Sequence, residues 1–276
     1  MTLGEVLRAA TEYLEGKGVD TPRVDAELLL AHALDLRRIQ LYTEYDRPLT
    51  EAERAAARVL VERRGKREPL AYVLGEWGFR RIVLKTDARA LVPRPETEIV
   101  VERALALVES VDAPRVLDVG TGTGAIALSI ASERPDAHVT ATDTSDEALA
   151  LARENAERLD IEVGLVRTSL VENLDGAFDL VVSNPPYVLA SELEGLPAEL
   201  LAEPRGALVD AGQTEALGRD ARRILDGWLV LEVHEDRAAT VAELLSDLGY
   251  AEARITRDLA GRERVVEARW TKSSRR

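Results

Sequence analysis

The sequence predicts an α/β protein: a small helical domain followed by a domain built on a parallel β-sheet with helices on both faces. In the first 75 or so residues, apolar side chains recur with the 3.6-residue period of α-helices, in runs separated by short turns. From residue 96 onward, short apolar runs typical of strands alternate with helical runs, as parallel strands and their crossover helices do. We therefore expect domains at residues 1–75 and 96–276, with a linker over 76–95.

Three helices are expected in the first domain. The first ends before the break at Gly16–Gly18. Pro22 begins the second, because a proline at the first helical position lacks only an N–H that would be unpaired there anyway. Thr50 and Glu53 form a capping box that begins the third, which ends near Gly65.

The linker is expected to form a β-hairpin, since apolar residues such as Phe79, Ile82 and Leu84 flank a short polar turn. Beyond it, helices are expected at residues 98–108, 125–133 and 146–158, and strands at 115–119, 138–142, 163–167, 179–182 and 228–233. The last two strands, 251–256 and 264–270, bracket a turn and are expected to be antiparallel.

Composition excludes several classes of protein. The 276 residues contain no cysteine, which rules out disulfides, thiolate metal sites and cysteine nucleophiles. The formal net charge of −14 argues against a large nucleic-acid interface, which needs a basic face to neutralise phosphates, so no direct nucleic-acid binding is expected. The three histidines, His32, His138 and His234, are scattered, and no metal site is expected.

The sequence also lacks the features of membrane and secreted proteins. No apolar run approaches the ~18 residues of a membrane span. The N-terminal segment has no basic region followed by an apolar core, as a signal peptide would. A cytoplasmic protein without membrane association is therefore expected.

A glycine-rich loop, Gly120–Gly124 (GTGTG), follows a predicted strand and opens a predicted helix. Glycines have no Cβ, so a ligand can lie against the backbone at the helix N-terminus. Asp143 ends the next strand, where a carboxylate can accept hydrogen bonds from both hydroxyls of a ribose. A cofactor containing adenosine is predicted. Because the loop with Ala125 also satisfies G-x-G-x-x-A, the loop alone leaves a nicotinamide dinucleotide and S-adenosylmethionine both open.

The tetrapeptide Asn184-Pro185-Pro186-Tyr187 follows another predicted strand, so it faces the same crevice as the glycine loop. These residues suit an acceptor NH2 on a planar, conjugated centre, whose nitrogen is a poor nucleophile. The Asn184 side-chain oxygen and the Pro185 carbonyl can each accept one N–H, which orients the nitrogen and favours its developing positive charge. Tyr187 can stack on the acceptor plane. The alternative is an ordinary turn, since asparagine and proline are common turn formers.

With these motifs the chain resembles class I S-adenosylmethionine-dependent methyltransferases that modify nitrogen. Within them it resembles the HemK/PrmC family of peptide-chain-release-factor glutamine methyltransferases. The resemblance spans nearly the whole chain. Besides GTGTG, Asp143 and NPPY, it rests on DAELLLAHAL (residues 25–34), EPLAYVLG (68–75), LVPRPETE (91–98) and EPRGAL (203–208).

The resemblance implies a substrate-docking N-terminal helical domain, a β-hairpin linker and a Rossmann-like seven-stranded methyltransferase domain. It implies methyl transfer from S-adenosylmethionine to the side-chain amide nitrogen (N5) of the glutamine in the Gly-Gly-Gln motif of class I peptide chain release factors, which act in translation termination. The implied cofactor-binding residues are Gly120, Thr121, Gly122, Thr123, Gly124, Asp143, Leu170 and Asn184. The implied glutamine-binding residues are Asn184, Pro185, Pro186 and Tyr187, of which Asn184, Pro185 and Tyr187 are catalytic.

The chain departs from the family near the expected adenine site, where the family often has an acid followed by an aromatic residue. Here those positions are Ser169 and Leu170. Serine can still accept a hydrogen bond from the adenine amine and leucine can cover the ring, so cofactor affinity rather than reaction type is affected.

Two rival functions remain open. An adenine-N6 methyltransferase acting on nucleic acid shares NPPY and would flip its target base into the pocket, although the net charge disfavours it. A non-catalytic protein that keeps a cofactor pocket is the second rival, and the intact Asn184 argues against it.

Overall fold

The computed structural model describes residues 1–272, which divide into two compact units. One unit comprises residues 1–76 together with 196–202, and the other comprises residues 77–195 and those from 203 onward. No helix among the described residues combines the length and the apolar character needed to cross a membrane.

The first unit is helical, and its helix starts follow the local sequence. It contains α1 (Leu3–Gly16), α2 (Pro22–Ala33), α3 (Gln40–Thr43), α4 (Glu51–Gly65), α5 (Leu70–Leu74) and α9 (Ala198–Leu201). Thr50 and Glu53 make the expected capping box at the start of α4. Leucines of α1, α2 and α3 fill the core of this unit. The short helices α3 and α5 are additions to the three expected.

The second unit is built on a sheet of seven described strands in the order β5-β4-β3-β6-β7-β9-β8. These strands are β3 (Arg115–Val119), β4 (His138–Asp143), β5 (Gly164–Arg167), β6 (Phe178–Ser183), β7 (Leu225–Glu232), β8 (Ala251–Arg257) and β9 (Glu263–Trp270). The strands from β3 to β7 pair in parallel, and β9 is antiparallel to both β7 and β8. The predicted α/β fold class is confirmed, including the antiparallel pair at the end.

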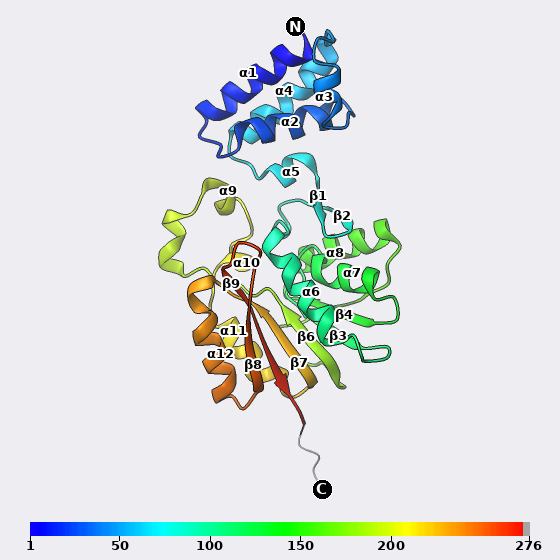
Figure 1. Ribbon diagram of the computed structural model, residues 1–276, viewed down its shortest axis with the longest axis vertical. Helices are drawn as coiled ribbons and strands as arrows, with labels where there is room; N and C mark the ends of the chain where they lie inside the picture. Colours follow the sequence, from blue (N-terminus) through cyan, green and yellow to red (C-terminus); the bar gives the residue numbers. More distant parts are fainter. Residues whose placement is uncertain (273–276) are drawn as a thin grey trace. The chain divides into compact units, whose positions relative to one another are not determined.

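Helices cover both faces of this sheet (Figure 1). On one face α6 (Glu98–Leu107), α7 (Ala125–Glu133) and α8 (Asp146–Leu159) pack into one apolar cluster with the strands. On the other face α11 (Gln213–Ala221) and α12 (Ala238–Asp247) form a second cluster. The helices α11 and α12, and the one-turn helix α10 (Arg205–Leu208), are additions to the expected elements.

The predicted hairpin is present as a two-stranded sheet of β1 (Glu76–Phe79) and β2 (Ile82–Lys85). Phe79, Ile82 and Leu84 are buried in the same cluster as α6 and α7. The fully buried Asn155 of α8 accepts a hydrogen bond from the Lys85 N–H at 2.6 Å. Its amide nitrogen donates to the Lys85 carbonyl at 3.1 Å and to the Thr123 carbonyl at 2.9 Å. One side chain thus ties β2 to the glycine loop.

Candidate active site

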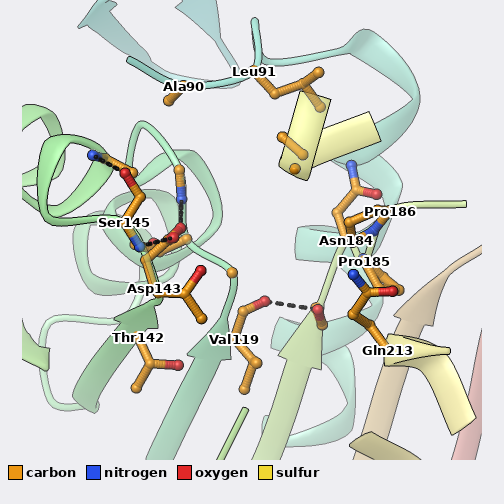
Figure 2. Close-up of a pocket in the computed structure, with 18 of the residues that line it drawn as sticks. Ala90, Leu91, Val119, Thr142, Asp143, Ser145, Asn184, Pro185, Pro186 and Gln213 are labelled. Carbon is orange, nitrogen blue, oxygen red and sulfur yellow. Dashed lines mark hydrogen bonds between the residues drawn. The ribbon is translucent and has the colours of Figure 1, made fainter. Parts of the chain in front are cut away.

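A cavity of about 670 Å³ lies at the carboxyl ends of β3, β4 and β6, within the second unit. Because β3 and β6 are neighbours in the sheet but lead to helices on opposite faces, this is a topological switch point, where open α/β sheets bind ligands. Figure 2 shows Asp143 and Ser145 on one side of the cavity, and Asn184, Pro185 and Pro186 on the other.

The glycine loop connects β3 to α7. The N–H groups of Gly120 and Thr121 donate to the Thr142 carbonyl at 2.8 and 2.9 Å, which fixes the loop against the end of β4. Gly124 has φ of +85°, and a Cβ there would lie 2.9 Å from the Leu128 side chain. Only glycine therefore fits at Gly124. Gly124 itself does not line the cavity, whereas the four loop residues before it do.

Asp118 is buried beneath this loop, at the end of β3. Its carboxylate accepts hydrogen bonds from the Thr121 hydroxyl at 2.6 Å and from the Ala127 N–H at 3.2 Å. Burial raises the pKa of Asp118 to about 7, and the nearby Asp143 charge adds to this effect. Asp118 thus joins the loop to the first turn of α7.

Asp143 ends β4 and lines the cavity. One carboxylate oxygen accepts from the Gly122 N–H at 3.0 Å and the other from the Ser145 N–H at 2.9 Å. The Ser145 hydroxyl in turn caps α8. A carboxylate offers about four acceptor positions, so Asp143 retains capacity for a ligand.

The segment after β5 contributes a third wall through Thr168, Ser169 and Leu170. Leu170 has φ of +50°, which is unusual for a non-glycine residue. The Thr142 hydroxyl lies 3.5 Å from the Leu170 carbonyl.

On the opposite side, the Asn184 amide nitrogen donates to the Thr97 hydroxyl at 3.2 Å. The preceding Ser183 donates its hydroxyl to the Val119 carbonyl at 2.7 Å, which joins the ends of β6 and β3. Asn184, Pro185 and Pro186 line the cavity, but Tyr187 does not. The Tyr187 ring lies 6.2 Å from the His234 ring, and burial raises the pKa of Tyr187 to about 12.

Further walls come from residues outside the glycine loop, Asp143 and the NPPY segment. Leu91 lies above the cavity in Figure 2, and Gln213 begins α11 beside Pro185. Glu203 is buried, accepts from the Val92 N–H at 2.9 Å and pairs with Arg94. The contacts of Glu203 with Val92 and Arg94 join LVPRPETE and EPRGAL, two segments that the family resemblance had already singled out. No local sequence feature distinguishes Gln213. Among the described residues, no group of three acidic or histidine side chains is placed to hold a metal ion.

Comparison with known proteins covers both units. Residues 5–75 match the family model for the PrmC N-terminal domain, and residues 99–221 match the methyltransferase small domain. The chain is 42% identical over 275 residues to a release factor glutamine methyltransferase of Deinococcus radiodurans, an alignment that covers 98% of this chain and 99% of that one. It is 41% identical to the protein of the same name from Geobacter sulfurreducens, over 97% and 96% of the two chains.

Solved structures agree on the fold. The hMettl16 catalytic domain superposes with a TM-score of 0.55 at 17% identity, over 70% of this chain and 76% of that one. At that identity the likeness concerns the fold alone. The full-length relatives, by contrast, share sequence across both units and so confirm the resemblance seen in the motifs. The chain belongs to the family of release factor glutamine methyltransferases.

Proposed function

We propose that this protein transfers a methyl group from S-adenosylmethionine to the side-chain amide nitrogen of the glutamine in the Gly-Gly-Gln motif of class I release factors. The observation that carries the proposal is the position of Asn184 and Pro185, which face the glycine loop and Asp143 across one cavity. S-adenosylmethionine supplies an electrophilic methyl group. The chain's own residues must therefore hold the acceptor amide and orient its nitrogen.

The cavity fits this cofactor. Its volume of about 670 Å³ falls in the range of sites for small molecules. Apart from Gly120 itself and its two chain neighbours, no atom of the described residues lies within 4 Å of where a Cβ at Gly120 would be, so a ligand can approach the backbone there. The free acceptor positions of Asp143 suit the ribose hydroxyls. Ser169 and Leu170 suit the adenine edge and ring.

Asn184 and Pro185 have the chemistry that the acceptor needs. An amide nitrogen shares its lone pair with the carbonyl and is a weak nucleophile. The Asn184 Oδ1 accepts no hydrogen bond from the described residues, and its amide nitrogen is engaged by Thr97. That oxygen, together with the Pro185 carbonyl, can take up both N–H groups of a glutamine and favour the positive charge that grows on nitrogen.

Pro186 and Tyr187 complete the proposed glutamine site. Two successive prolines hold the backbone at fixed φ, so the Pro185 carbonyl keeps its direction. We assign to the Tyr187 ring the stacking on the glutamine amide plane when the substrate is bound.

The helical first unit is proposed to dock the release factor. Its support is that the glycine loop, Asp143 and the NPPY segment all belong to the second unit, while a separate family model matches residues 5–75. The substrate works in translation termination, so we place the reaction in the cytoplasm.

Transfer of tritium from labelled S-adenosylmethionine tests the function. Purified class I release factor should be labelled, and a release factor whose Gly-Gly-Gln glutamine is replaced should not. DNA and RNA in parallel reactions should stay unlabelled. Label that passes to nucleic acid instead would establish the adenine-N6 alternative, and cofactor binding without transfer to any acceptor would establish a non-catalytic protein.

A further inference from the structure

A buried carboxylate lies directly behind the proposed acceptor site. Glu232 is the last residue of β7 and is 1% exposed. Ser183 of β6 pairs with Leu231 of β7, so Asn184 and Glu232 follow these partners at the same level of adjacent strands. Within residues 1–272, neither carboxylate oxygen of Glu232 has a hydrogen-bond partner of good geometry. A buried, unpaired carboxylate is costly, which points to a role at the site.

Thr97 is a neighbour of both this carboxylate and Asn184. Thr97 is 4% exposed, and its hydroxyl accepts the hydrogen bond from the Asn184 amide nitrogen. The same hydroxyl is the strongest of the neighbours that lower the pKa of Glu232. Arg264 of β9 and Arg94 also lower it, whereas Glu96 raises it.

The direction of hydrogen bonding follows from this arrangement. A hydroxyl has one proton to donate, and an ionised carboxylate can only accept. When Thr97 directs its proton to Glu232, it can only accept from Asn184. The Asn184 side chain must then turn its nitrogen to Thr97 and its oxygen to the cavity.

We propose that Glu232, acting through Thr97, is a positioning residue that holds the Asn184 amide with its oxygen towards the acceptor nitrogen. This inference rests on the proposed function of Asn184. Protonated Glu232 donates to Thr97 instead, Thr97 then donates to Asn184, and the amide turns its N–H groups to the cavity, where they repel those of the substrate. Glu232 therefore also makes the orientation of Asn184 depend on pH.

The charged and polar groups around Glu232 decide the pH range in which it titrates. Burial raises the pKa of Glu232 to about 7, and the groups around it are Thr97, Arg94 and Glu96 from the segment before α6, Arg264 from β9 and Tyr187 after β6. The rate of methyl transfer should rise as pH increases through this range. For one proton with that pKa, the ionised fraction changes about tenfold between pH 6 and pH 8.

Single-turnover methylation of release factor, with cofactor and substrate saturating, tests the proposal in the full-length enzyme. Glu232→Gln should lower the rate about tenfold or more at pH 8, less than the ~10²–10³-fold typical of losing a direct transition-state hydrogen bond. Its remaining rate should change less than about twofold between pH 6 and pH 8, because glutamine does not titrate in this range. Thr97→Val should behave likewise, whereas Thr97→Ser, which keeps the hydroxyl, should retain the wild-type rate and pH profile.

A matched control separates positioning from stability. Glu267 of β9 is also a buried carboxylate, but Arg103 pairs with it at 2.8 Å. Glu267→Gln should destabilise the fold yet keep the wild-type pH profile. A normal rate and pH profile in Glu232→Gln would overturn the inference while leaving the proposed function intact.

A second measurement does not depend on the substrate. The side-chain amide ¹⁵N resonance of Asn184, assigned by its absence in Asn184→Asp, should shift with a midpoint near pH 7 in the wild type and stay constant in Glu232→Gln. If the chemical shift of the Asn184 side-chain amide does not change with pH in the wild type, the proposed coupling between Glu232 and Asn184 is wrong. A wild-type enzyme that labels no release factor would refute the proposed function, and this resonance would still decide the inference.

Discussion

The two amide atoms of Asn184 differ in their contacts: the nitrogen donates to the Thr97 hydroxyl, and the oxygen accepts no hydrogen bond from the described residues. Replacing it with alanine removes the acceptor atom from the cavity wall. We expect Asn184→Ala to lower kcat ~10²–10³-fold, or about 3–4 kcal/mol, because the lost hydrogen bond strengthens as charge grows on the substrate nitrogen. Single-turnover methylation of release factor measures the effect.

Two comparisons sharpen this prediction. Cofactor affinity, measured by calorimetry, should fall much less, since the glycine loop and Asp143 supply most of its contacts. Asn184→Asp should keep more activity than Asn184→Ala, because a carboxylate oxygen still accepts the hydrogen bond. A near-normal rate for Asn184→Ala at saturation would mean that the acceptor is held elsewhere.

The buried Asp118 should make the free energy of unfolding depend on pH. Its folded pKa of about 7 lies above its ordinary value of 3.8, so between these values the folded protein keeps a proton that the unfolded chain has released. The contribution of Asp118 to the free energy of unfolding is therefore fully present below about pH 4. It is lost as pH rises towards 7, by up to ~1.4 kcal/mol per pH unit. Glu232 acts in the same direction.

Urea unfolding of the wild type and Asp118→Asn at pH 5, 6 and 7 checks this. The wild type should lose on the order of 2 kcal/mol relative to the variant between pH 5 and pH 7. Parallel stability curves for the two proteins would show that Asp118 is already ionised in the folded state.

Local chemistry explains which site residues the sequence could reveal. The glycine loop, Asp143 and Asn184 follow strands directly, so their positions depend only on strand ends. Gln213 and Glu232 reach the site through the packing of α11 and the pairing of β7. No local pattern encodes those contacts.

At the scale of elements, the strands and the helices between them were predictable because each carries its own periodicity. The predicted strand at residues 228–233 starts three residues later than β7 (Leu225–Glu232), since Asp226 and Gly227 interrupt the apolar run. The helices α9 and α10 are single turns that start after prolines, so they are too short to show a period.

The buried Asn155 holds β2 and the glycine loop to α8 with three hydrogen bonds. Asn155→Ala leaves three backbone groups of Lys85 and Thr123 without that partner. Each buried unsatisfied group costs ~1–3 kcal/mol, so we expect a loss of at least ~2 kcal/mol in unfolding free energy. Cofactor affinity should fall too, since Thr123 lines the cavity.

Chemical denaturation and calorimetry with S-adenosylmethionine measure the two effects. The exposed Glu157, two residues further along α8, offers the control, and Glu157→Ala should change neither quantity appreciably. If Asn155→Ala binds cofactor as the wild type does, the hairpin and the loop are not coupled through this side chain.

At the scale of the whole molecule, chemistry and recognition are proposed to belong to different units. The segment after NPPY contributes residues to both units. Its Glu199 pairs with Arg64 and Arg67 in the helical unit at 2.7 Å, and four residues later Glu203 accepts from Val92 in the sheet unit. Glu203 directly precedes the residues between 204 and 217 that line the cavity, and it is anchored within the sheet unit by Val92 and Arg94.

A shortened chain that begins at residue 77 tests this division. Because the cavity walls belong to the sheet unit, this chain should bind S-adenosylmethionine nearly as the full protein does. It should methylate a short Gly-Gly-Gln peptide at a similar rate, since the peptide offers nothing for the helical unit to hold. For intact release factor its kcat/KM should fall more than tenfold, a loss of over about 1.4 kcal/mol of transition-state binding. The peptide serves as the internal control: equal losses on both substrates would indicate damage to the cavity, whereas an unchanged kcat/KM for the intact protein would show that the helical unit does not dock the substrate.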